Sequence, residues 1–209
     1  MNQLFDFFLE PYRTVTTVNI IVEILAVVFG IASVWYAKKE HIFVYPTGII
    51  STALYVYICY KFTLYGDLII NIYYTLMSIY GWYMWTRMVN SRHLEITRTS
   101  RVDKLKALGI FASTAIFVII VYVYFNRFDR LTDYFDTFTT GIFFAAMWLM
   151  ANKKIEHWIL WIGGNIISVP LYFIKGLGFS GIQFTIFLIL AYLGYTSWKK
   201  TLDKKTSIS

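Results

Sequence analysis

The sequence predicts an all-α integral membrane protein with seven transmembrane helices. The first observation is the composition: 58% of the 209 residues are hydrophobic, 20% are aromatic and only 15% are charged, which is typical of membrane proteins. The second is a series of apolar runs of about 20 residues, the length that crosses a hydrocarbon core of about 30 Å. These runs lie at residues 18–37, 43–61, 66–86, 106–125, 134–151, 155–175 and 178–198.

An internal repeat predicts how the seven helices are arranged. A uniform shift of 113 in the numbering superposes four distinctive pairs: Glu23 with Asp136, Trp35 with Trp148, Gly81 with Gly194, and Trp85 with Trp198. The stretches IISTALY (49–55) and IISVPLY (166–172) match at a shift of 117, so we expect a four-residue insertion before this block and a deletion after it. Two three-helix units joined by one extra helix must have the same orientation. This 3+1+3 parallel repeat is an architecture of transporters, which bind substrate between the repeats near the membrane midplane.

The repeat also sets the expected boundaries along the chain. Residues 1–17 lack the pattern of a secretory signal peptide, and their aromatic side chains predict an interfacial segment. The expected order is the N-terminal segment 1–17, the first three-helix repeat 18–86, a basic loop with linker helix and outer loop 87–133, the second three-helix repeat 134–198, and the tail 199–209.

The distribution of basic residues predicts the orientation in the membrane. Threading the seven spans places 14 of the 19 lysines and arginines on one side and five on the other. Basic loops remain in the cytoplasm, so we expect the N-terminus outside and the C-terminus in the cytoplasm. The net charge of +7 is then explained by topology and contact with membrane lipid, and nucleic acid is not an expected partner.

The sixth span, WILWIGGNIISVPLYF (158–173), predicts a substrate-binding face. Steps of three and four residues put side chains on one side of a helix, and this stripe consists of Trp158, Trp161, Asn165, Ser168 and Tyr172. An amide in hydrocarbon is costly without a partner, so the stripe should face the bundle interior. Two alternatives stay open: Trp158 as an interfacial belt residue, and Asn165 and Ser168 as groups that only bond neighbouring helices.

The same span contains three candidate gating residues. Gly163 and Gly164 allow a neighbouring helix or a substrate to approach closely, and Pro170 removes a backbone hydrogen bond and predicts a kink. The alternative is that the proline is structural. At the 117 shift the first repeat keeps the serine and tyrosine of the stripe but lacks its tryptophans and asparagine, so the site should be asymmetric.

Three residues elsewhere are further candidates for substrate contact. Asn71 and Gln183 occupy near-equivalent positions in the third and seventh spans, and Tyr45 in YPTG could form an aromatic wall. Because no lysine or arginine is expected near the midplane, a flat neutral or cationic ring is favoured over a phosphorylated substrate. Glu23 and Asp136 lie near the outer ends of equivalent spans, as capping acids or as groups that attract a cation or couple protons.

Other classes of membrane protein are disfavoured. A rhodopsin-like protein needs a Schiff-base lysine in the last span, which has none. The three histidines lack metal-ligand spacing and the single cysteine, Cys59, excludes an internal disulfide and a multi-cysteine metal site. We therefore expect no catalytic residue, no cofactor and no metal.

The motifs resemble the PnuC-type bacterial vitamin transporters. They are YPTG opening the second span, YGWYMW closing the third, and W-x-x-W-x-x-x-N running into NIISVPLYF in the sixth. Tyr45 departs from the Trp-Pro-x-Gly expected in YPTG. Trp158, Trp161 and Asn165 match the family's substrate motif.

The resemblance implies a SWEET-like fold and a homotrimer in the bacterial inner membrane. It also implies facilitated diffusion of nicotinamide riboside, a form of vitamin B3, with phosphorylation by a cytoplasmic riboside kinase trapping the substrate for NAD biosynthesis. The alternative is thiamine or another flat cationic vitamin, with proton coupling left open.

Overall fold

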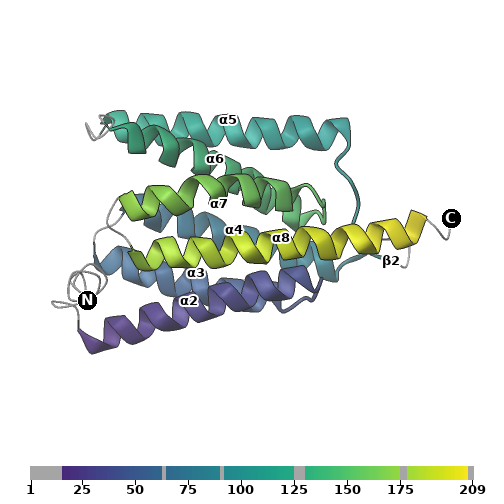
Figure 1. The fold of residues 1–209 in the computed structure, drawn as a ribbon, viewed down its shortest axis with the longest axis horizontal. Coiled ribbons are helices and arrows are strands. Elements are labelled where there is room, and N and C mark those ends of the chain that lie inside the picture. Colours follow the sequence, from purple (N-terminus) through teal and green to yellow (C-terminus); the bar gives the residue numbers. More distant parts are fainter. Residues whose placement is uncertain (1–15, 63–64, 90–91, 125–129, 175–177, 207–209) are drawn as a thin grey trace.

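Seven helices make up most of the computed structural model, which describes residues 16–62, 65–89, 92–124, 130–174 and 178–206 (Figure 1). Nearly all of the predicted N-terminal segment 1–17 lies outside the described residues. Each helix matches one predicted span, and their bounds are α2 (Thr17–Lys38), α3 (Val44–Lys61), α4 (Tyr65–Thr86), α5 (Arg101–Tyr124), α6 (Leu131–Ala151), α7 (His157–Ile174) and α8 (Gly178–Thr206). By length and composition, α2, α5, α7 and most of α8 (Phe179–Lys204) can cross a membrane.

Helices α5 and α8 extend furthest beyond their predicted spans. Helix α5 begins at Arg101 because Ser100 and Asp103 cap it: the Asp103 carboxylate accepts the Ser100 backbone N–H at 2.9 Å, and the Ser100 hydroxyl accepts the Asp103 N–H at 3.1 Å. Helix α8 continues past Trp198 to Thr206 and extends beyond the bundle (Figure 1). The predicted basic loop contains a small hairpin of β1 (Met88–Val89) and β2 (Arg92–His93).

Six of the helices form a ring. Helix α2 packs against α3, α3 against α4, α4 against α6, α6 against α7, α7 against α8, and α8 returns to α2. Helix α5 packs against α6 on the outside (Figure 1), and its apolar side chains such as Leu105, Ile116 and Ile120 are exposed. The order of contacts places α3 across the ring from α7, and α4 across from α8. We call α2–α4 the first half and α6–α8 the second half.

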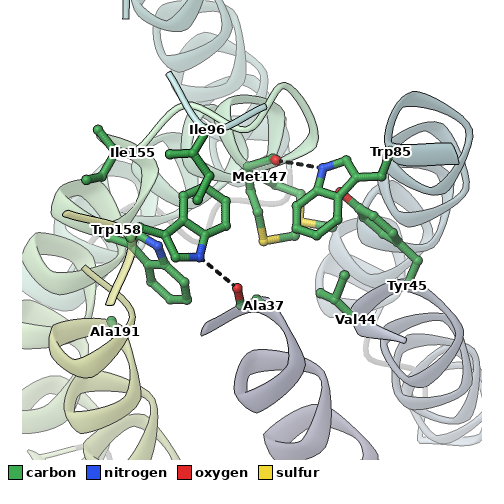
Figure 2. Packing of buried hydrophobic residues seen from close by; sticks show 11 residues of the cluster. Ala37, Val44, Tyr45, Trp85, Ile96, Met147, Ile155, Trp158 and Ala191 are labelled. Carbon is green, nitrogen blue, oxygen red and sulfur yellow. Dashed lines mark hydrogen bonds between the residues drawn. The ribbon is translucent and has the colours of Figure 1, made fainter. Parts of the chain in front are cut away.

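The hydrophobic core is densest at one end of the ring. This end holds the C-termini of α2, α4 and α6 and the N-termini of α3, α5 and α7 (Figure 1); we call it the basic end, because it is the side with the larger share of lysine and arginine. The buried cluster drawn in Figure 2 consists of Ala37, Val44, Tyr45, Trp85, Ile96, Met147, Met150, Ile155, Trp158, Ala191 and Trp198.

Hydrogen bonds at the basic end recur at the spacing of the repeat. The Trp85 indole N–H donates to the carbonyl of Met150 at 3.3 Å, and the Trp198 indole N–H donates to the carbonyl of Ala37 at 2.9 Å (Figure 2). The two donors are related by the shift of 113, and so are the two acceptors. In the first hydrogen bond the first half donates to the second half, and in the other the second half donates to the first.

The start of α3 and the start of α7 follow the same spacing. Helix α3 begins at Val44 and α7 begins at His157, which is the equivalent position at the shift of 113. Tyr45 packs edge-on against Trp85 at 5.1 Å between ring centroids, and Trp158 packs edge-on against Trp198 at 5.8 Å. The expected four-residue insertion before residue 49 is therefore wrong. IISTALY and IISVPLY occupy the same helix face about one turn apart, since four residues are close to one helical turn.

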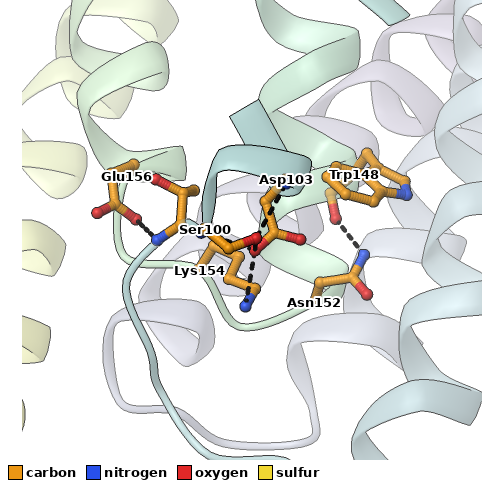
Figure 3. A network of polar contacts seen from close by, with 7 residues as sticks. Ser100, Asp103, Trp148, Asn152, Lys154 and Glu156 are labelled. Atoms are coloured by element: carbon orange, nitrogen blue, oxygen red, sulfur yellow. Dashed lines mark hydrogen bonds and ion pairs between the residues drawn. The ribbon is translucent and has the colours of Figure 1, made fainter. Parts of the chain in front are cut away.

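The segment before α5 is tied to the turn between α6 and α7. The Thr97 N–H donates to the carbonyl of Lys153 and the Ile155 N–H donates to the carbonyl of Thr97, both at 3.0 Å. An ion pair of 3.1 Å between Lys154 and Asp103 adds a side-chain link (Figure 3). The start of α5 is thus held against the second half.

Candidate functional site

Helix α7 turns the predicted stripe toward the ring interior. Trp158, Asn165 and Ser168 are each 1% exposed, whereas Ile159 and Ile166 on the flank are 50% and 56% exposed. Trp161 and Tyr172 are half-buried. The expectation that the stripe faces inward is confirmed, and its burial excludes an exposed belt position for Trp158.

Asn165 is the most unusual buried side chain of this stripe. Neither its amide oxygen nor its amide nitrogen has a hydrogen-bond partner among the residues that the structure describes. A buried polar group left unsatisfied costs about 1–3 kcal/mol. The alternative that Asn165 bonds a neighbouring helix is therefore not what this structure shows, and its amide has the capacity to bind a ligand.

The equivalent position in the first half explains why Asn165 has no partner. At the shift of 113 this position is Thr52, which shares a hydrogen bond of 2.7 Å with Thr75 on α4. The equivalent of Thr75 in the second half is Leu188 on α8, whose side chain has no hydrogen-bonding group. The first half thus satisfies this position internally and the second half does not.

A row of aromatic rings, most of them stacked, includes Trp161, one helical turn from Asn165. Trp161 stacks on Phe143 with 4.9 Å between centroids and 23° between planes, and Tyr74 lies 6.5 Å from Trp161. Phe143 is 6.1 Å from Phe184, which stacks on Tyr172 at 4.6 Å. Offset stacking is a favoured arrangement of aromatic pairs, so this wall is suited to a flat ring.

Sequence reasoning missed Phe143 and Phe184, although a signal was available for Phe143. At the uniform shift of 113, Phe143 aligns with Gly30 and Trp161 with Gly48. A large aromatic residue in one half opposite a glycine in the other marks a place where the two halves differ in shape.

The two candidate gating glycines have different surroundings. A Cβ on Gly164 would collide with the Phe143 ring, so only glycine leaves room for that ring. A Cβ on Gly163 would meet nothing within 4 Å. The predicted close approach of a neighbouring helix is found at Gly164 and not at Gly163, and close approach of a substrate stays a prediction for both glycines. Helix α7 runs through Pro170 to Ile174, with the proline ring exposed.

Trp158 and Tyr45 belong to an aromatic layer at the basic end. The layer crosses the ring as Tyr45, Trp85, Trp198 and Trp158, with successive centroids 5.1, 6.1 and 5.8 Å apart. The Tyr45 hydroxyl and the Trp158 indole nitrogen are buried and have no partner among the described residues. Asn165 lies two helical turns beyond Trp158, about 10 Å along the helix axis, so the layer forms the floor of the candidate site.

Gln183 and Asn71 are bonded differently. The Tyr55 hydroxyl on α3 donates to the Gln183 amide oxygen on α8 at 3.3 Å. The Asn71 amide nitrogen donates to the carbonyl of Asp67 on its own helix at 2.8 Å. Gln183 is therefore oriented by a contact between the two halves, whereas Asn71 is bonded within α4.

A sequence profile of a family described as nicotinamide mononucleotide transporters matches residues 20–200. The chain belongs to this family. The resemblance to PnuC-type transporters that the motifs indicate is therefore confirmed. Since this is a family of membrane transporters, the chain is a multi-pass membrane transporter and not an enzyme.

Several curated relatives are similar to this transporter over most of its length. The nicotinamide riboside transporter PnuC of Escherichia coli (strain K12) is 24% identical over 89% of this chain and 88% of its own length. The protein of the same name from Neisseria mucosa is 26% identical over 86% of this chain and 72% of its own. The riboflavin/roseoflavin transporter RibM of Streptomyces davaonensis is 25% identical over 58% of each chain.

A solved structure has a similar fold. The crystal structure of the vitamin B3 transporter PnuC superposes with a TM-score of 0.65 and 23% sequence identity, covering 88% of this transporter and 82% of that chain. At this identity the similarity concerns the fold.

Proposed function

We propose that this transporter carries nicotinamide riboside across the bacterial inner membrane. The observation that carries the proposal is the buried, unpartnered amide of Asn165, one turn along α7 from Trp161. Relatives named as nicotinamide riboside transporters in several bacteria support the choice of substrate.

The chemistry of nicotinamide riboside matches these two residues. Its pyridinium ring is flat and cationic, which favours stacking on the Trp161 indole. Its carboxamide presents one acceptor and two donors, which complement the donors and acceptor of the Asn165 amide. Ser168, Tyr172 and Gln183 line the same side and are proposed to contact the riboside, with Tyr45 and Trp158 in the floor.

The free nucleoside fits the site better than the nucleotide in the family's description. Recognition of a phosphate normally uses arginine or lysine, and neither α6 nor α7 contains one within its bounds. A phosphate would have to enter a region built from aromatic and amide side chains.

The arrangement in the membrane is part of the proposal. We infer that all seven helices span the bilayer as a 3+1+3 parallel repeat of SWEET type, with repeats 18–86 and 134–198, and that the basic end lies in the cytoplasm with the C-terminus. The contacts that recur at the shift of 113 support the repeat, and the distribution of basic residues supports the orientation. A homotrimer is implied by the family resemblance.

Transport is proposed to be facilitated diffusion. A cytoplasmic riboside kinase would trap the substrate by phosphorylation and supply NAD biosynthesis. Proteoliposomes test this: uptake should stop at equal concentrations inside and outside, and should continue when a riboside kinase and ATP are enclosed. Uphill accumulation driven by a pH gradient alone would instead assign proton coupling, with Glu23 and Asp136 as the acids to replace first.

Binding titrations of the purified protein test the substrate. Nicotinamide riboside, nicotinamide mononucleotide, thiamine and riboflavin are compared by calorimetry, and the first should bind tightest. Asn165→Ala and Trp161→Ala should weaken binding while the folded oligomer persists. Tighter binding of thiamine or riboflavin would reassign the substrate, and unchanged affinity in both variants would move the site elsewhere.

A further inference from the structure

We propose that a clasp between the two halves locks the basic end of the transport path and opens once in each cycle. The inference rests on the proposed transport activity. The clasp consists of three contacts: the Glu40–Lys153 ion pair, the Trp85–Met150 hydrogen bond and the Trp198–Ala37 hydrogen bond.

The clasp is built reciprocally. Each contact has one partner in the first half or directly after α2 and the other in the second half or directly after α6. The two tryptophan hydrogen bonds are equivalent, because their donors are 113 residues apart and so are their acceptors. The ion pair joins two residues that are themselves 113 apart. A contact between equivalent residues lies at the interface of two equivalent units, as in an isologous dimer, so the clasp sits where the two halves meet.

The ion pair is held in a defined geometry. The Lys153 ammonium lies 2.7 Å from the Glu40 carboxylate and 4.4 Å from the centre of the Trp85 ring. Both residues have a left-handed backbone conformation, with φ of 56° at Glu40 and 49° at Lys153. Residues other than glycine adopt this conformation at an energetic cost. The Lys153 side chain is only 8% exposed. The Glu40 side chain is 32% exposed, so two equivalent turns share one partly buried charge pair.

The position of the clasp gives it the role of a lock. The surrounding layer is nearly free of solvent, with Tyr45, Trp158 and Trp198 at most 1% exposed. This layer separates Asn165 from the outer surface of the basic end, so a substrate leaving toward that end has to cross it. All three contacts join the two halves, and separation of the halves breaks them together.

The hydrogen bond that Tyr73 makes between the halves, away from the basic end, lacks this reciprocity. The Tyr73 hydroxyl on α4 donates to the carbonyl of Phe144 on α6 at 3.0 Å. The equivalent of Tyr73 in the other half is Ile186, whose side chain has no hydroxyl to donate an equivalent bond. Reciprocal fastening is thus a property of the clasp, and this distinguishes a gate contact from ordinary helix packing.

Cysteine accessibility tests the lock without any assumption about the substrate. In a Cys59→Ser background, Ala191→Cys places a thiol on α8 within the buried layer, where Ala191 is 1% exposed. The rate of maleimide labelling from the basic end is measured in reconstituted vesicles. Trp85→Phe with Trp198→Phe removes both indole N–H groups and keeps aromatic rings, so labelling should become faster by on the order of tenfold, since two hydrogen bonds are lost.

Matched controls separate the clasp from general loosening. Trp82→Phe is the same substitution on the same helix at a tryptophan that is 41% exposed, and Asp103→Asn breaks the neighbouring Lys154 ion pair, which joins α5 to the α6–α7 turn. Both should label like the parent. Labelling of the double tryptophan variant that is no faster than that of Trp82→Phe would overturn the proposal.

Charge reversal gives a second, independent readout. Glu40→Lys and Lys153→Glu each place like charges together and should speed labelling, and the double reversal should restore the parent rate. A double reversal as fast as the single variants would contradict the lock. Titrations of the same proteins with nicotinamide riboside separate the proposed substrate from the proposed clasp. A parent protein that does not bind the riboside would contradict the substrate assignment, whereas the labelling rates would still test the clasp.

Discussion

The basic end and the middle of the ring use the two halves of the chain in opposite ways. At the basic end, equivalent residues of the two halves make the same contacts: Tyr45 and Trp158 each pack on a tryptophan, and each ring fills the space left by a glycine, Gly81 or Gly194. In the middle, the same shift pairs unlike residues: Gly30 with Phe143, Gly48 with Trp161, and Thr52 with Asn165.

The difference separates scaffold from recognition. In the first half the Ser51 hydroxyl donates to the carbonyl of Ala26 at 2.7 Å and Thr52 bonds Thr75, so polar groups there are satisfied within the protein. In the second half Asn165 is unsatisfied beside stacked rings. The free-energy cost of the unsatisfied Asn165 amide can be recovered when a ligand forms hydrogen bonds with it. This favours the second half as the part of the protein that recognises the substrate.

The largest effect is expected at Asn165. Asn165→Leu should weaken nicotinamide riboside binding by on the order of 100-fold, because a buried amide contact is worth about 1–3 kcal/mol. The same change should leave the unfolding temperature equal or higher, since it removes an unsatisfied buried group. Calorimetry and thermal unfolding in detergent measure both.

Thr52→Val is the matched variant in the first half. It should lower the unfolding temperature, because loss of the Thr75 bond removes about 0.5–1.5 kcal/mol, the usual net value of such a hydrogen bond. It should change the affinity for nicotinamide riboside less than about threefold, because Thr52 lies outside the proposed binding site. If the two positions responded alike, the contrast between the halves would be lost.

The next largest effect is expected from the adjacent glycines. Gly164→Ala should destabilise the protein by about 1–3 kcal/mol, the usual result of overpacking, because its methyl group collides with the Phe143 ring. Gly163→Ala should be nearly neutral, since it enters open space. Thermal unfolding of the two variants compares them directly, and equal shifts would refute the account of the Phe143 ring.

A smaller effect is expected from the aromatic wall. Phe143→Leu should weaken riboside binding about three- to tenfold, because an aromatic pair contributes about 0.5–1.5 kcal/mol beyond area burial. Phe144→Leu is the control on the neighbouring residue, whose ring stacks on Tyr73 at 3.7 Å. Affinities from titration decide between them, and an equal loss in both would assign the effect to α6 as a whole.

The smallest effect is expected in the floor. Tyr45→Phe should raise the free energy of unfolding by no more than about 1 kcal/mol, because it removes a buried hydroxyl without a described partner. The ring stays in place, so affinity should hold. A clear fall in affinity would show that the Tyr45 hydroxyl reaches the substrate.

Helix positions were readable from the sequence because long apolar runs dominate in a membrane protein. The predicted start of α5 was late, since the capping pair Ser100 and Asp103 lies before the apolar run begins. The predicted shift of 117 for the block IISTALY and IISVPLY was wrong. Its matching residues are displaced by four positions from the shift of 113, and four residues are close to one helical turn, so both alignments place the same kinds of residue on one helix face. Phe143 was missed because a phenylalanine in an apolar run is not distinctive by itself, and its alignment with Gly30 appears only when the two halves are compared position by position.

The candidate site was predictable where polar residues stand out in a membrane helix. Asn165 and Trp161 were found by helical spacing, whereas the packing of Trp158 against Trp198 and Gly194 depends on contacts between distant segments. The different surroundings of Gly163 and Gly164 likewise depend on where the Phe143 ring lies, which no local pattern encodes.

The pairing of Thr97 with the α6–α7 turn has a mechanical consequence. Through it, and through the Asp103–Lys154 ion pair, α5 is fastened to α6 and α7, so the linker helix moves with the second half. In the proposed separation of the halves, α2–α4 would therefore move as one group of helices and α5–α8 as the other. The covalent connection between these two groups is the segment 87–96, which ends at the buried Ile96, so this segment would be the chain connection that has to accommodate the proposed opening.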